Sequence, residues 1–442
     1  MTTGLTDPTG QMAPPPVPAQ GLDVWFVGTR SALFGLALKT GFWTVLTLGF
    51  YRFWMKTRLR RWYWSSIRPG GHPMEYVGDP LEKLLGFFIA VVILTFYIGI
   101  VNLVLMFVSF SVFNSSWVGY FASFLGIIPL WFYASYRARR YVLGRTRWRG
   151  VRFGLEPGAW GFALRALMHW AITIVSLGIL WPRMTFSLEK YRTDRTYFGS
   201  AKLHQGGRWP MLYRAAIPFA VALAGILILA LWVFWVDPLL RGDADTFGDV
   251  IKNIDKAIGG EELLFSWTDP WRLLFLVPLL PVLLYGAFHY RFSAKRIMAN
   301  HKSSDGIRFA SKLSAPRVTL IYSLGNFIAY MILLLGVGLI IGVAFALLGP
   351  ETMVQAQLGQ ESPFGDLPKW MSFAIIAALY LAVFLLWNVL LNAFVTYPLM
   401  RHMAQTTSLS DVAGLIAVSQ RARDEFAEAE GFAEALDLGA AI

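Results

Sequence analysis

Long apolar stretches alternate with short basic segments along most of the chain. Six of these stretches are long enough to cross the hydrocarbon core of a bilayer, which takes about 20 residues of helix. They are Leu84 to Phe113, Trp117 to Tyr133, Leu212 to Val236, Leu273 to Phe288, Thr319 to Leu348 and Met371 to Val395. The pattern therefore predicts an all-α polytopic membrane protein with about six transmembrane helices.

Two further apolar stretches are shorter and carry cations. Leu33 to Trp54 contains Lys39, and Trp160 to Trp181 contains Arg165 and His169. Each lies between segments that the charge pattern assigns to one side of the membrane, so we expect it to re-enter the bilayer or to lie in the interface. The alternative is that one or both cross fully and the charge rule fails locally.

A hydroxyl-Leu-Gly sequence recurs in both short stretches, as Thr47-Leu48-Gly49 and as Ser176-Leu177-Gly178. A hydroxyl group satisfies freed backbone groups inside a membrane, and glycine is typical of a turn. We therefore expect a bend at both positions. When Gly35 is aligned with Gly161, Lys39 also aligns with Arg165, which predicts a cation at one shared position.

The basic segments set the predicted orientation. They are Lys56 to Arg68, Arg137 to Arg152, Arg183 to Arg214 and Arg291 to Arg317, whereas Asp237 to Asp269 is acidic. Because Lys and Arg are enriched in cytoplasmic loops, six crossings would place all four basic segments and both termini in the cytoplasm. The net charge of +12 is then explained by retained loops rather than by nucleic-acid binding.

A basic helix end followed by a strand, a glycine turn and a second strand recurs along the chain. Arg137-Ala138-Arg139-Arg140-Tyr141 precedes Gly150, and Ser293-Ala294-Lys295-Arg296-Ile297 precedes Gly306. In the first copy, Arg58 to Arg61 would lead to a strand at Trp62 to Ser66, a turn at Gly70-Gly71 and a strand closing on Tyr76. These internal repeats predict small cytoplasmic β-hairpins that pair into one sheet.

Composition supports a membrane class and removes several kinds of chemistry. Hydrophobic residues make up 56% and charged residues 15% of the chain, with a mean hydropathy of +0.51. The absence of cysteine excludes disulfides, thiolate zinc sites and cysteine nucleophiles. The six histidines show no HxxxH or HExxH spacing, and there is no GxxxxGK[ST], GxGxxG or GxSxG motif. We therefore expect no metal, no cofactor and no enzymatic activity, and a membrane-embedded enzyme is the least favoured alternative.

Four regions follow from these patterns. Residues 1–21 are a proline-rich stretch without a signal peptide and are expected to be disordered. Residues 22–210 hold helices near 33–54, 84–113, 117–136 and 160–181, and residues 211–398 hold helices near 212–236, 271–290, 319–348 and 371–397. Residues 399–442 form a cytoplasmic tail, with a helix from Ser410 to Ala435 that ends in acidic residues.

Two sets of side chains are candidates for binding. A basic cytoplasmic face would engage anionic lipid or an acidic protein partner through Arg58, Arg60, Arg61, Arg137, Arg139, Arg140, Lys295 and Arg296. A polar path for a passive channel or transporter would use Lys39, Arg165, His169, Asn388 and Asn392. Against that path, a snorkelling cation and an interhelical hydrogen bond explain the same residues. The six long stretches contain no Asp or Glu, so the carboxylate relay of ion-driven carriers is missing.

The run Thr47-Leu48-Gly49-Phe50-Tyr51-Arg52-Phe53-Trp54, followed by Lys56 to Gly71, resembles the YjgN-like family of bacterial inner-membrane proteins. Ser176 to Arg183 is similar to the same motif, although Leu180 stands where the tyrosine is expected. The resemblance covers about Val24 to Tyr397 by layout. It implies a polytopic helical protein of the bacterial inner membrane, and it implies no reaction and no catalytic residues because the function of the family is unknown.

Overall fold

The structure is a computed structural model that describes residues 21–113, 117–231, 240–241, 266–267, 277–348, 369–411, 414–415 and 417–420. Residues 1–20 of the predicted tail 1–21, most of the acidic loop and the residues beyond 420 lie outside these ranges. The chain divides into two compact parts. The first holds the described residues up to Trp209, Arg296–Leu313 and those from Leu320 onward, and the second holds Pro210–Lys295 and Ser314–Thr319.

Within the described ranges, the chain consists of five modules in which two helical arms lie between two short strands. Module 1 is β1 (Leu22–Phe26), α1 (Arg30–Leu46), α2 (Arg52–Ser66) and β2 (Ile67–Pro69). Module 2 is β3 (Met74–Tyr76), α3 (Pro80–Phe96), a π-helical turn (Tyr97–Val101), α4 (Asn102–Phe113), α5 (Trp117–Gly144) and β4 (Thr146–Trp148). Module 3 is β5 (Val151–Leu155), α6 (Ala159–Val175), α7 (Trp181–Thr193) and β6 (Thr196–Phe198).

The remaining modules have longer helices. After β7 (Ala201–Lys202), module 4 is β8 (His204–Gln205), a 3₁₀ turn (Trp209–Leu212), α8 (Tyr213–Leu231), α10 (Leu279–Ala299) and β11 (Lys302–Ser304). Module 5 is β12 (Ile307–Ser311), α11 (Ala315–Leu348), α13 (Lys369–Leu391), a π-helical turn η5 (Asn392–Thr396), α14 (Tyr397–Gln405) and β13 (Thr407–Ser410). Two further short strands, β9 (Leu240–Arg241) and β10 (Ser266–Trp267), pair with each other.

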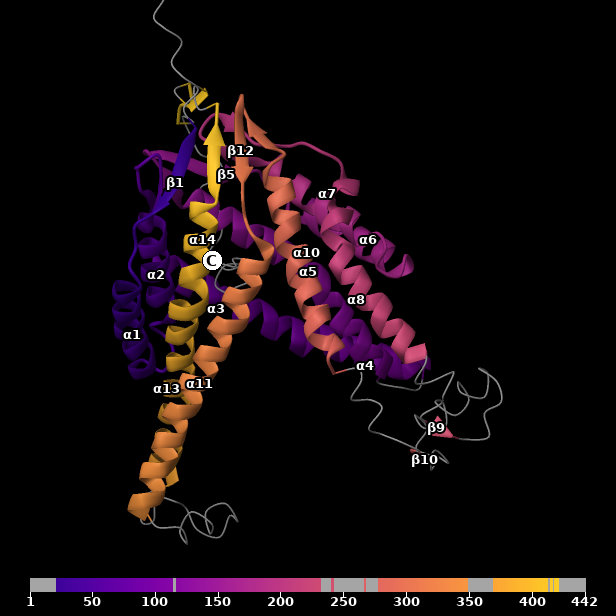
Figure 1. The fold of residues 1–442 in the computed structure, drawn as a ribbon. Helices are drawn as coiled ribbons and strands as arrows, with labels where there is room; N and C mark the ends of the chain where they lie inside the picture. The colour runs from indigo at the N-terminus through magenta and orange to yellow at the C-terminus, as the bar shows by residue number, and fades with distance from the viewer. Residues whose placement is uncertain are drawn as a thin grey trace, which may run out of the picture. The chain divides into compact units, whose positions relative to one another are not determined.

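The two strands of every module are hydrogen-bonded to each other in an antiparallel pair. Five strands form one sheet in the order β3-β4-β5-β6-β7, and six form another in the order β2-β1-β13-β12-β11-β8. The chain joins these sheets at both ends, since β2 leads into β3 and β7 into β8, so the strand order is circular. In Figure 1, β1 and β12 lie at one end of α1, α2, α11 and α13.

Four helical stretches of the described chain are long and apolar enough to cross a membrane. They are Pro80–Val112, Trp209–Leu231, Ala315–Leu339 and Tyr380–Gln405, and Ala159–Val175 is a shorter apolar helix. All four fall in modules 2, 4 and 5. The prediction of a mostly helical chain with membrane-length helices is confirmed, whereas the described residues supply four such stretches and not six.

The helical hairpins of modules 1 and 3 are short, and each packs against a longer helix of another module. Leu33 and Ala37 of α1 and Leu59 of α2 share a core with Val389 of α13. The close approach of α1 to α13 depends on Gly41, where an added Cβ would meet a Leu385 methyl group at 1.8 Å. In module 3, Leu155, Phe162, Ala166, Met184 and Leu188 pack against Tyr136 of α5. The short hairpins are therefore supported along one side by a longer helix.

Several predicted boundaries are wrong. The segment Trp62 to Ser66 is not a strand but the end of α2, because Tyr63 follows Leu59 by one helical turn and both are buried in the same core. The apolar stretch 33–54 holds α1 and only the first residues of α2, which continues to Ser66, and the stretch 160–181 ends at the first residue of α7. The predicted C-terminal helix does not begin at Ser410, which ends β13 instead.

The sheets are more extensive than the small β-hairpins that the sequence analysis predicts for an all-α fold. Strand pairs β4–β5 and β11–β12 are joined through Gly150 and Gly306, at the positions expected for two of the predicted hairpins. In the first copy β2 and β3 do not pair, because β2 joins β1 and β3 joins β4. The described strands form two main sheets and not one, because β2 does not pair with β3 and β7 does not pair with β8.

Candidate functional site

Modules 1 and 3 contain short helical hairpins of the same build. Val24 pairs with Pro69 in module 1, and Phe153 pairs with Phe198 in module 3. Both partners shift by 129 positions, from 24 to 153 and from 69 to 198, and the first residues of α1 and α6 shift by the same amount. The two hairpins therefore correspond residue by residue, without an insertion.

The bends predicted from sequence are present in both hairpins. Leu48 and Leu177 adopt positive φ angles of 50° and 51°, and they are followed by Gly49 at 94° and Gly178 at 86°. Two successive residues in the left-handed region reverse the chain within a few residues, and glycine at the second position relieves the steric cost. The hydroxyl-Leu-Gly sequence therefore marks the tip of each hairpin.

The hydroxyl group of each bend has the role expected for it. The Thr47 hydroxyl accepts a hydrogen bond from the Tyr51 N–H at 2.9 Å, and the Ser176 hydroxyl accepts one from the Leu180 N–H at 3.2 Å. Both N–H groups belong to the turn before the second helix. The bonds satisfy backbone donors at a place where the surrounding side chains are apolar.

The structure corrects the alignment of Lys39 with Arg165. Under the shift of 129 that superposes both bends, Lys39 corresponds to Met168, and Arg165 corresponds to Leu36. The glycine-based alignment used a shift of 126, which is nearly one helical turn away. The helix face is set by the distance from the bend, so Lys39 and Arg165 do not share one position of the two hairpins.

Large apolar side chains cover the hairpin tips. Leu48 is 73% exposed and Leu177 is 88% exposed, and their neighbours Phe50 and Ile179 are also exposed. An exposed apolar patch of this kind is typical of a surface that contacts lipid or another protein. The tips are therefore candidates for insertion into a bilayer.

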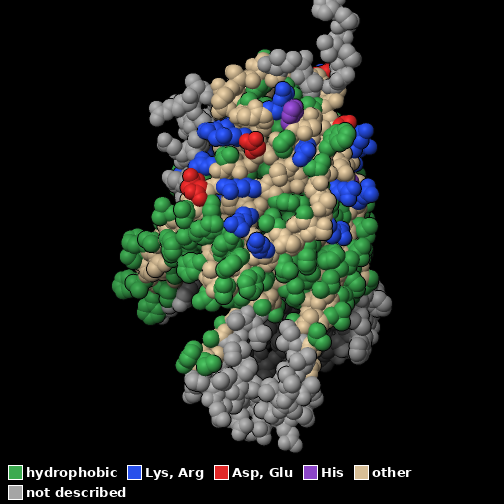
Figure 2. Space-filling model, turned by 90° about the vertical axis from the view of Figure 1, so that its left-hand side faces the viewer, with side chains coloured by type: hydrophobic (Ala, Val, Ile, Leu, Met, Phe, Trp, Pro, Cys, Tyr) green, Lys and Arg blue, Asp and Glu red, His purple; other side chains and the backbone are tan. Residues whose placement is uncertain are grey.

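Two cations lie at the same height on the first hairpin. Lys39 on α1 and Arg58 on α2 are each nine or ten residues from Leu48, and both are exposed. The Arg58 guanidinium lies over the Tyr51 ring at 5.7 Å from its centroid. Figure 2 shows Lys and Arg side chains gathered on the upper part of one face, above a lower part covered by hydrophobic side chains.

The other predicted cations of module 1 have partners within the protein. Arg60 is 8% exposed, and its Nη1 donates to the Tyr76 hydroxyl at 3.3 Å. Arg61 Nη2 donates to the Gly78 carbonyl at 2.9 Å, although the residue as a whole is exposed. Of the three arginines predicted here to form a binding face, Arg58 is therefore the exposed one whose guanidinium lies over the half-buried Tyr51 ring.

The cations predicted on α5 and α10 are also partly used within the fold. Arg137 donates to the Tyr133 hydroxyl at 2.7 Å, and both Arg139 and Arg140 are half-buried. Lys295, in the second compact part, lies over the Phe292 ring at 5.3 Å. Arg296 is half-buried in the last turn of α10. These side chains stabilise the protein as well as adding to its positive charge.

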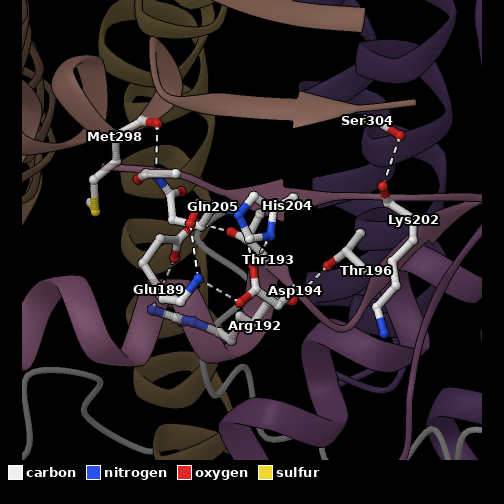
Figure 3. A network of polar contacts seen from close by, with 12 residues as sticks. Glu189, Arg192, Thr193, Asp194, Thr196, Lys202, His204, Gln205, Met298 and Ser304 are labelled. Carbon is white, nitrogen blue, oxygen red and sulfur yellow. Dashed lines mark hydrogen bonds and ion pairs between the residues drawn. The ribbon is translucent and has the colours of Figure 1, made fainter. Parts of the chain in front are cut away.

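A carboxylate that sequence reasoning did not single out binds three cations. Glu189 on α7 contacts Lys302 Nζ at 2.7 Å, Arg192 Nη2 at 3.3 Å and Arg139 Nη1 at 3.8 Å. Its side chain is 15% exposed. The group links α5, α7 and β11, and Figure 3 shows Glu189 beside Arg192. The signal in the sequence was a lone acidic residue in a helix that is otherwise basic.

Charge sets the protonation state of Glu189. Burial alone would raise the pKa of this carboxyl group, but Lys302, Arg139 and Arg192 together hold its pKa well below the ordinary range. Burial lowers the pKa of Arg192 in turn, while Glu189 acts in the opposite direction. The cluster is therefore ionised at neutral pH and neutralises charge that would otherwise be buried beside the sheet.

Polar contacts around the same place connect the sheet strands. The Gln205 N–H donates to Asp194 Oδ1 at 2.7 Å, and Gln205 Nε2 donates to the Met298 carbonyl at 3.1 Å (Figure 3). The Ser304 hydroxyl donates to the Lys202 carbonyl at 3.1 Å. The segment that joins the two sheets is therefore held by side chains on both sides of it.

The residues predicted for a polar path fall into separate clusters. His169 is buried on α6 in module 3, and Arg165 lies over the Tyr191 ring at 4.6 Å. Asn388 is exposed on α13, and Asn392 is the first residue of η5. Asn392 Nδ2 donates to Asn388 Oδ1 at 2.8 Å. Both asparagines belong to one helical arm, so they bond each other instead of lining a path with His169.

The described residues contain no group of three or more His, Asp or Glu side chains that would hold a metal ion.

Lys39 remains an exposed cation on α1, as snorkelling would require. The positively charged side chains around the hairpins are suited to binding an anion.

The family model described as bacterial protein of unknown function (DUF898) matches residues 22–341, which run from β1 well into α11. The chain belongs to this family. The match confirms the YjgN-like resemblance that the motif around Thr47 predicts. No curated protein and no solved structure matches the chain. Family membership, together with the four long apolar helices, is consistent with a bacterial membrane protein whose activity is not defined.

Proposed function

We propose that this chain is a non-enzymatic, multi-pass protein of the bacterial inner membrane that binds anionic lipid headgroups around two re-entrant helical hairpins. The observation that carries the proposal is the build of module 1, in which an exposed apolar tip lies below two exposed cations at one height. An apolar tip favours the hydrocarbon core, and cations at its border favour lipid phosphates.

Strand pairing supports the topology. Because both strands of each module bond each other, the two ends of every helical hairpin lie on the same side of the membrane. A module that contains one membrane-length helix must therefore return through its second arm. By this argument α5 and α10 also cross, which gives six crossings in modules 2, 4 and 5 and none in modules 1 and 3.

The dimensions of the short hairpins support re-entry. About nine residues separate Lys39 from the tip at Leu48, and nine residues of helix span about 13 Å. Half of the hydrocarbon core of a bilayer measures about 15 Å. A hairpin with its cations among the headgroups would therefore place its tip close to the middle of the bilayer.

The depth of the tips can be measured with single cysteines, since the chain has none of its own. We expect a spin label on Leu48→Cys or Leu177→Cys, in reconstituted vesicles, to contact oxygen strongly and a water-soluble nickel reagent weakly. A label on Gly71→Cys or Gly150→Cys should react with a membrane-impermeant thiol reagent from one and the same side. Labels at Gly71 and Gly150 that react from opposite sides would contradict this topology.

Lipid binding is tested by removing the two exposed cations of the first hairpin, Lys39 and Arg58. Each cation near an anionic surface contributes about 1 kcal/mol, so Lys39→Gln with Arg58→Gln should weaken binding of phosphatidylglycerol by about 2 kcal/mol, or roughly 30-fold. The measurement is the rise in the melting temperature of the detergent-purified protein as phosphatidylglycerol is titrated, with phosphatidylcholine as the neutral lipid. We expect phosphatidylcholine to shift both proteins equally.

The matched control is Arg308→Gln, which removes an exposed cation from β12 and leaves the hairpin unchanged. This variant should keep the response of the wild-type protein to phosphatidylglycerol. A double variant that responds as strongly as wild type would show that the hairpin cations do not bind the lipid.

A further inference from the structure

Two arginines of module 3 lie over the same tyrosine ring. The Arg165 guanidinium on α6 is 4.6 Å from the centroid of the Tyr191 ring on α7, and the Arg195 guanidinium, between α7 and β6, is 3.8 Å from it. The two charged groups are therefore at most about 8 Å apart, which is close enough for the oxygens of one phosphate group to accept hydrogen bonds from both. We call Arg165, Tyr191 and Arg195 the Tyr191 cluster.

The tyrosine ring of this cluster is fixed in place. Its hydroxyl donates to the Gly158 carbonyl at 2.9 Å, and the residue is 8% exposed. A Cβ at Gly161 would lie 2.6 Å from the same hydroxyl, so glycine at this position allows α6 to approach the ring. Guanidinium groups that already pack on a fixed ring lose less conformational freedom when they bind an anion.

Positive charge exceeds negative charge around the cluster. Arg165 is exposed, and within the described residues its guanidinium makes one hydrogen bond, to the Gly161 carbonyl at 3.2 Å, and no ion pair. Arg195 Nε lies 4.0 Å from Glu156 Oε2, and the same carboxylate accepts a hydrogen bond from Lys202 Nζ at 3.1 Å. One carboxylate thus lies beside two cations, and Arg165 is left for an anion from outside the chain.

An apolar stripe of α6 runs beside Arg165 toward the hairpin tip. Trp160, Leu164 and Met168 are four residues apart, so they lie along one side of the helix, and each is more than half exposed. The Trp160 ring lies 4.8 Å from the Tyr133 ring of α5, and paired aromatic rings of this kind are typical of the border between hydrocarbon and headgroups. The stripe is suited to contact an acyl chain.

The height of Arg165 on the hairpin agrees with that border. Twelve residues separate Arg165 from the tip at Leu177, and twelve residues of helix span about 18 Å. Half of the hydrocarbon core measures about 15 Å. A tip near the middle of the bilayer therefore places the guanidinium at the level of the lipid phosphates, which favours a lipid over a soluble phosphate compound.

The first hairpin lacks this arrangement. Under the shift of 129, Leu36 stands at the position of Arg165, and Ser66 stands at the position of Arg195. Neither residue carries a charge. The Tyr191 cluster is therefore specific to module 3 and differs from the pair of exposed cations on module 1.

We propose that Arg165 and Arg195 together bind the phosphate of one anionic phospholipid, whose acyl chain lies along Leu164 and Met168. The phosphate supplies negative charge that Glu156 alone does not supply, and the two guanidinium groups bind its oxygens through charge-assisted hydrogen bonds. This inference rests on the proposed function, because it names one particular lipid site on the second hairpin.

Protection of Arg165 from an arginine-specific dicarbonyl reagent tests the site. The reagent is added to the detergent-purified protein, and mass spectrometry of peptides gives the rate of modification at each arginine. We expect phosphatidylglycerol to slow the modification of Arg165 by about 10-fold, because a bound phosphate occupies the edge of the guanidinium that reacts. Arg149, an exposed arginine over the Trp148 ring, is the control within the same protein and should react at an unchanged rate.

Two further compounds identify the source of the phosphate. Phosphatidylcholine has a headgroup without net charge, and soluble glycerol phosphate carries the phosphate without an acyl chain. We expect neither to protect Arg165 at the concentration at which phosphatidylglycerol does. Equal protection by glycerol phosphate would overturn the assignment to a lipid, and an unchanged rate in phosphatidylglycerol would overturn the site itself.

Variants of Arg195 test whether the two arginines share one phosphate. Arg195→Gln should remove most of the protection of Arg165 by phosphatidylglycerol, and Arg195→Lys should restore part of it, since an ammonium group binds phosphate without the paired geometry. Arg183→Gln removes another exposed cation from the same hairpin and should leave the protection unchanged. Protection that survives Arg195→Gln in full, or that lysine restores in no part, would contradict a shared site.

The titration described for the first hairpin keeps this inference separate from the proposed function. A melting temperature that rises with phosphatidylglycerol while Arg165 stays unprotected would disprove the Tyr191 cluster as a lipid site and leave the proposed function standing. A protein that shows neither the rise nor the protection would disprove both. In the variant Lys39→Gln with Arg58→Gln, the protection of Arg165 should equal that of the wild type.

Discussion

Replacing Glu189 with glutamine should lower the free energy of unfolding by about 3–5 kcal/mol, the usual cost of removing one partner from a buried ion cluster. The substitution preserves the shape of the side chain but leaves the positive charges of Lys302, Arg192 and Arg139 close together. The measurement is chemical or thermal unfolding of the detergent-purified protein at pH 7, followed by circular dichroism.

The stabilities of the wild-type protein and of Glu189→Gln should respond differently to acid. Since the pKa of Glu189 is lower in the folded protein than in the unfolded chain, its ionised form stabilises the fold at neutral pH. This contribution decreases as the pH falls below about 4.3, where the unfolded chain begins to bind the proton. The stability difference between wild type and Glu189→Gln should therefore become smaller between pH 5 and pH 3.

Asp411→Asn is the matched control for this prediction. Asp411 lies 3.9 Å from Arg308, and both side chains are at least half exposed. Exposed pairs contribute about 0–1 kcal/mol, so this variant should unfold almost as the wild type does. If Glu189→Gln were as stable as Asp411→Asn at pH 7, the cluster would not contribute to stability in the way its geometry implies.

Gly325→Val should separate α11 from the π-helical turn η5 and destabilise module 5 by at least about 1–3 kcal/mol, as overpacking does in a close-packed interior. A Cβ at Gly325 would lie 2.5 Å from the Phe394 carbonyl oxygen and 2.9 Å from a Val395 methyl carbon. The nearest obstacle is backbone, so a side-chain rotation does not relieve it. The yield and the melting temperature of the purified protein measure the effect.

Gly338→Val provides the comparison within the same helix. A Cβ at Gly338 meets nothing within 4 Å, and valine in place of glycine is slightly favourable to a helix. We expect this variant to fold with a melting temperature close to that of the wild type. Equal melting temperatures for both valine variants would mean that α11 does not approach η5 as closely as the structure shows.

Local features of the fold were predictable because they depend on residues close in sequence. The bends at Leu48 and Leu177 follow from a hydroxyl, a leucine and a glycine in a row, and the structure places a turn at each. The membrane-length helices follow from runs of apolar residues in the same way. Glycine turns also marked two strand pairs, at Gly150 and Gly306.

The candidate site was only partly predictable. The basic segments were evident, but nothing local indicated that Arg60 is buried under Tyr76 whereas Arg58 is exposed. The aromatic run at Trp62 to Ser66 favoured a strand by composition, and packing of Tyr63 against α13 decided for a helix. Likewise, no short-range pattern pairs Glu189 with Lys302, which is 113 residues away.

The sequence alone determined the membrane class, the bends of the short hairpins and the excess of basic residues, because each depends on hydrophobicity, backbone preference or charge within about 20 residues. Tertiary structure alone decided that both strands of each module pair with each other, and that β13 returns to β1. Hydrogen bonds between strands join residues far apart in the chain and are made by backbone groups that every residue carries. No side-chain pattern therefore specified which strands would meet across a helical hairpin, and the residue-by-residue correspondence of the two short hairpins became evident only from their shared register.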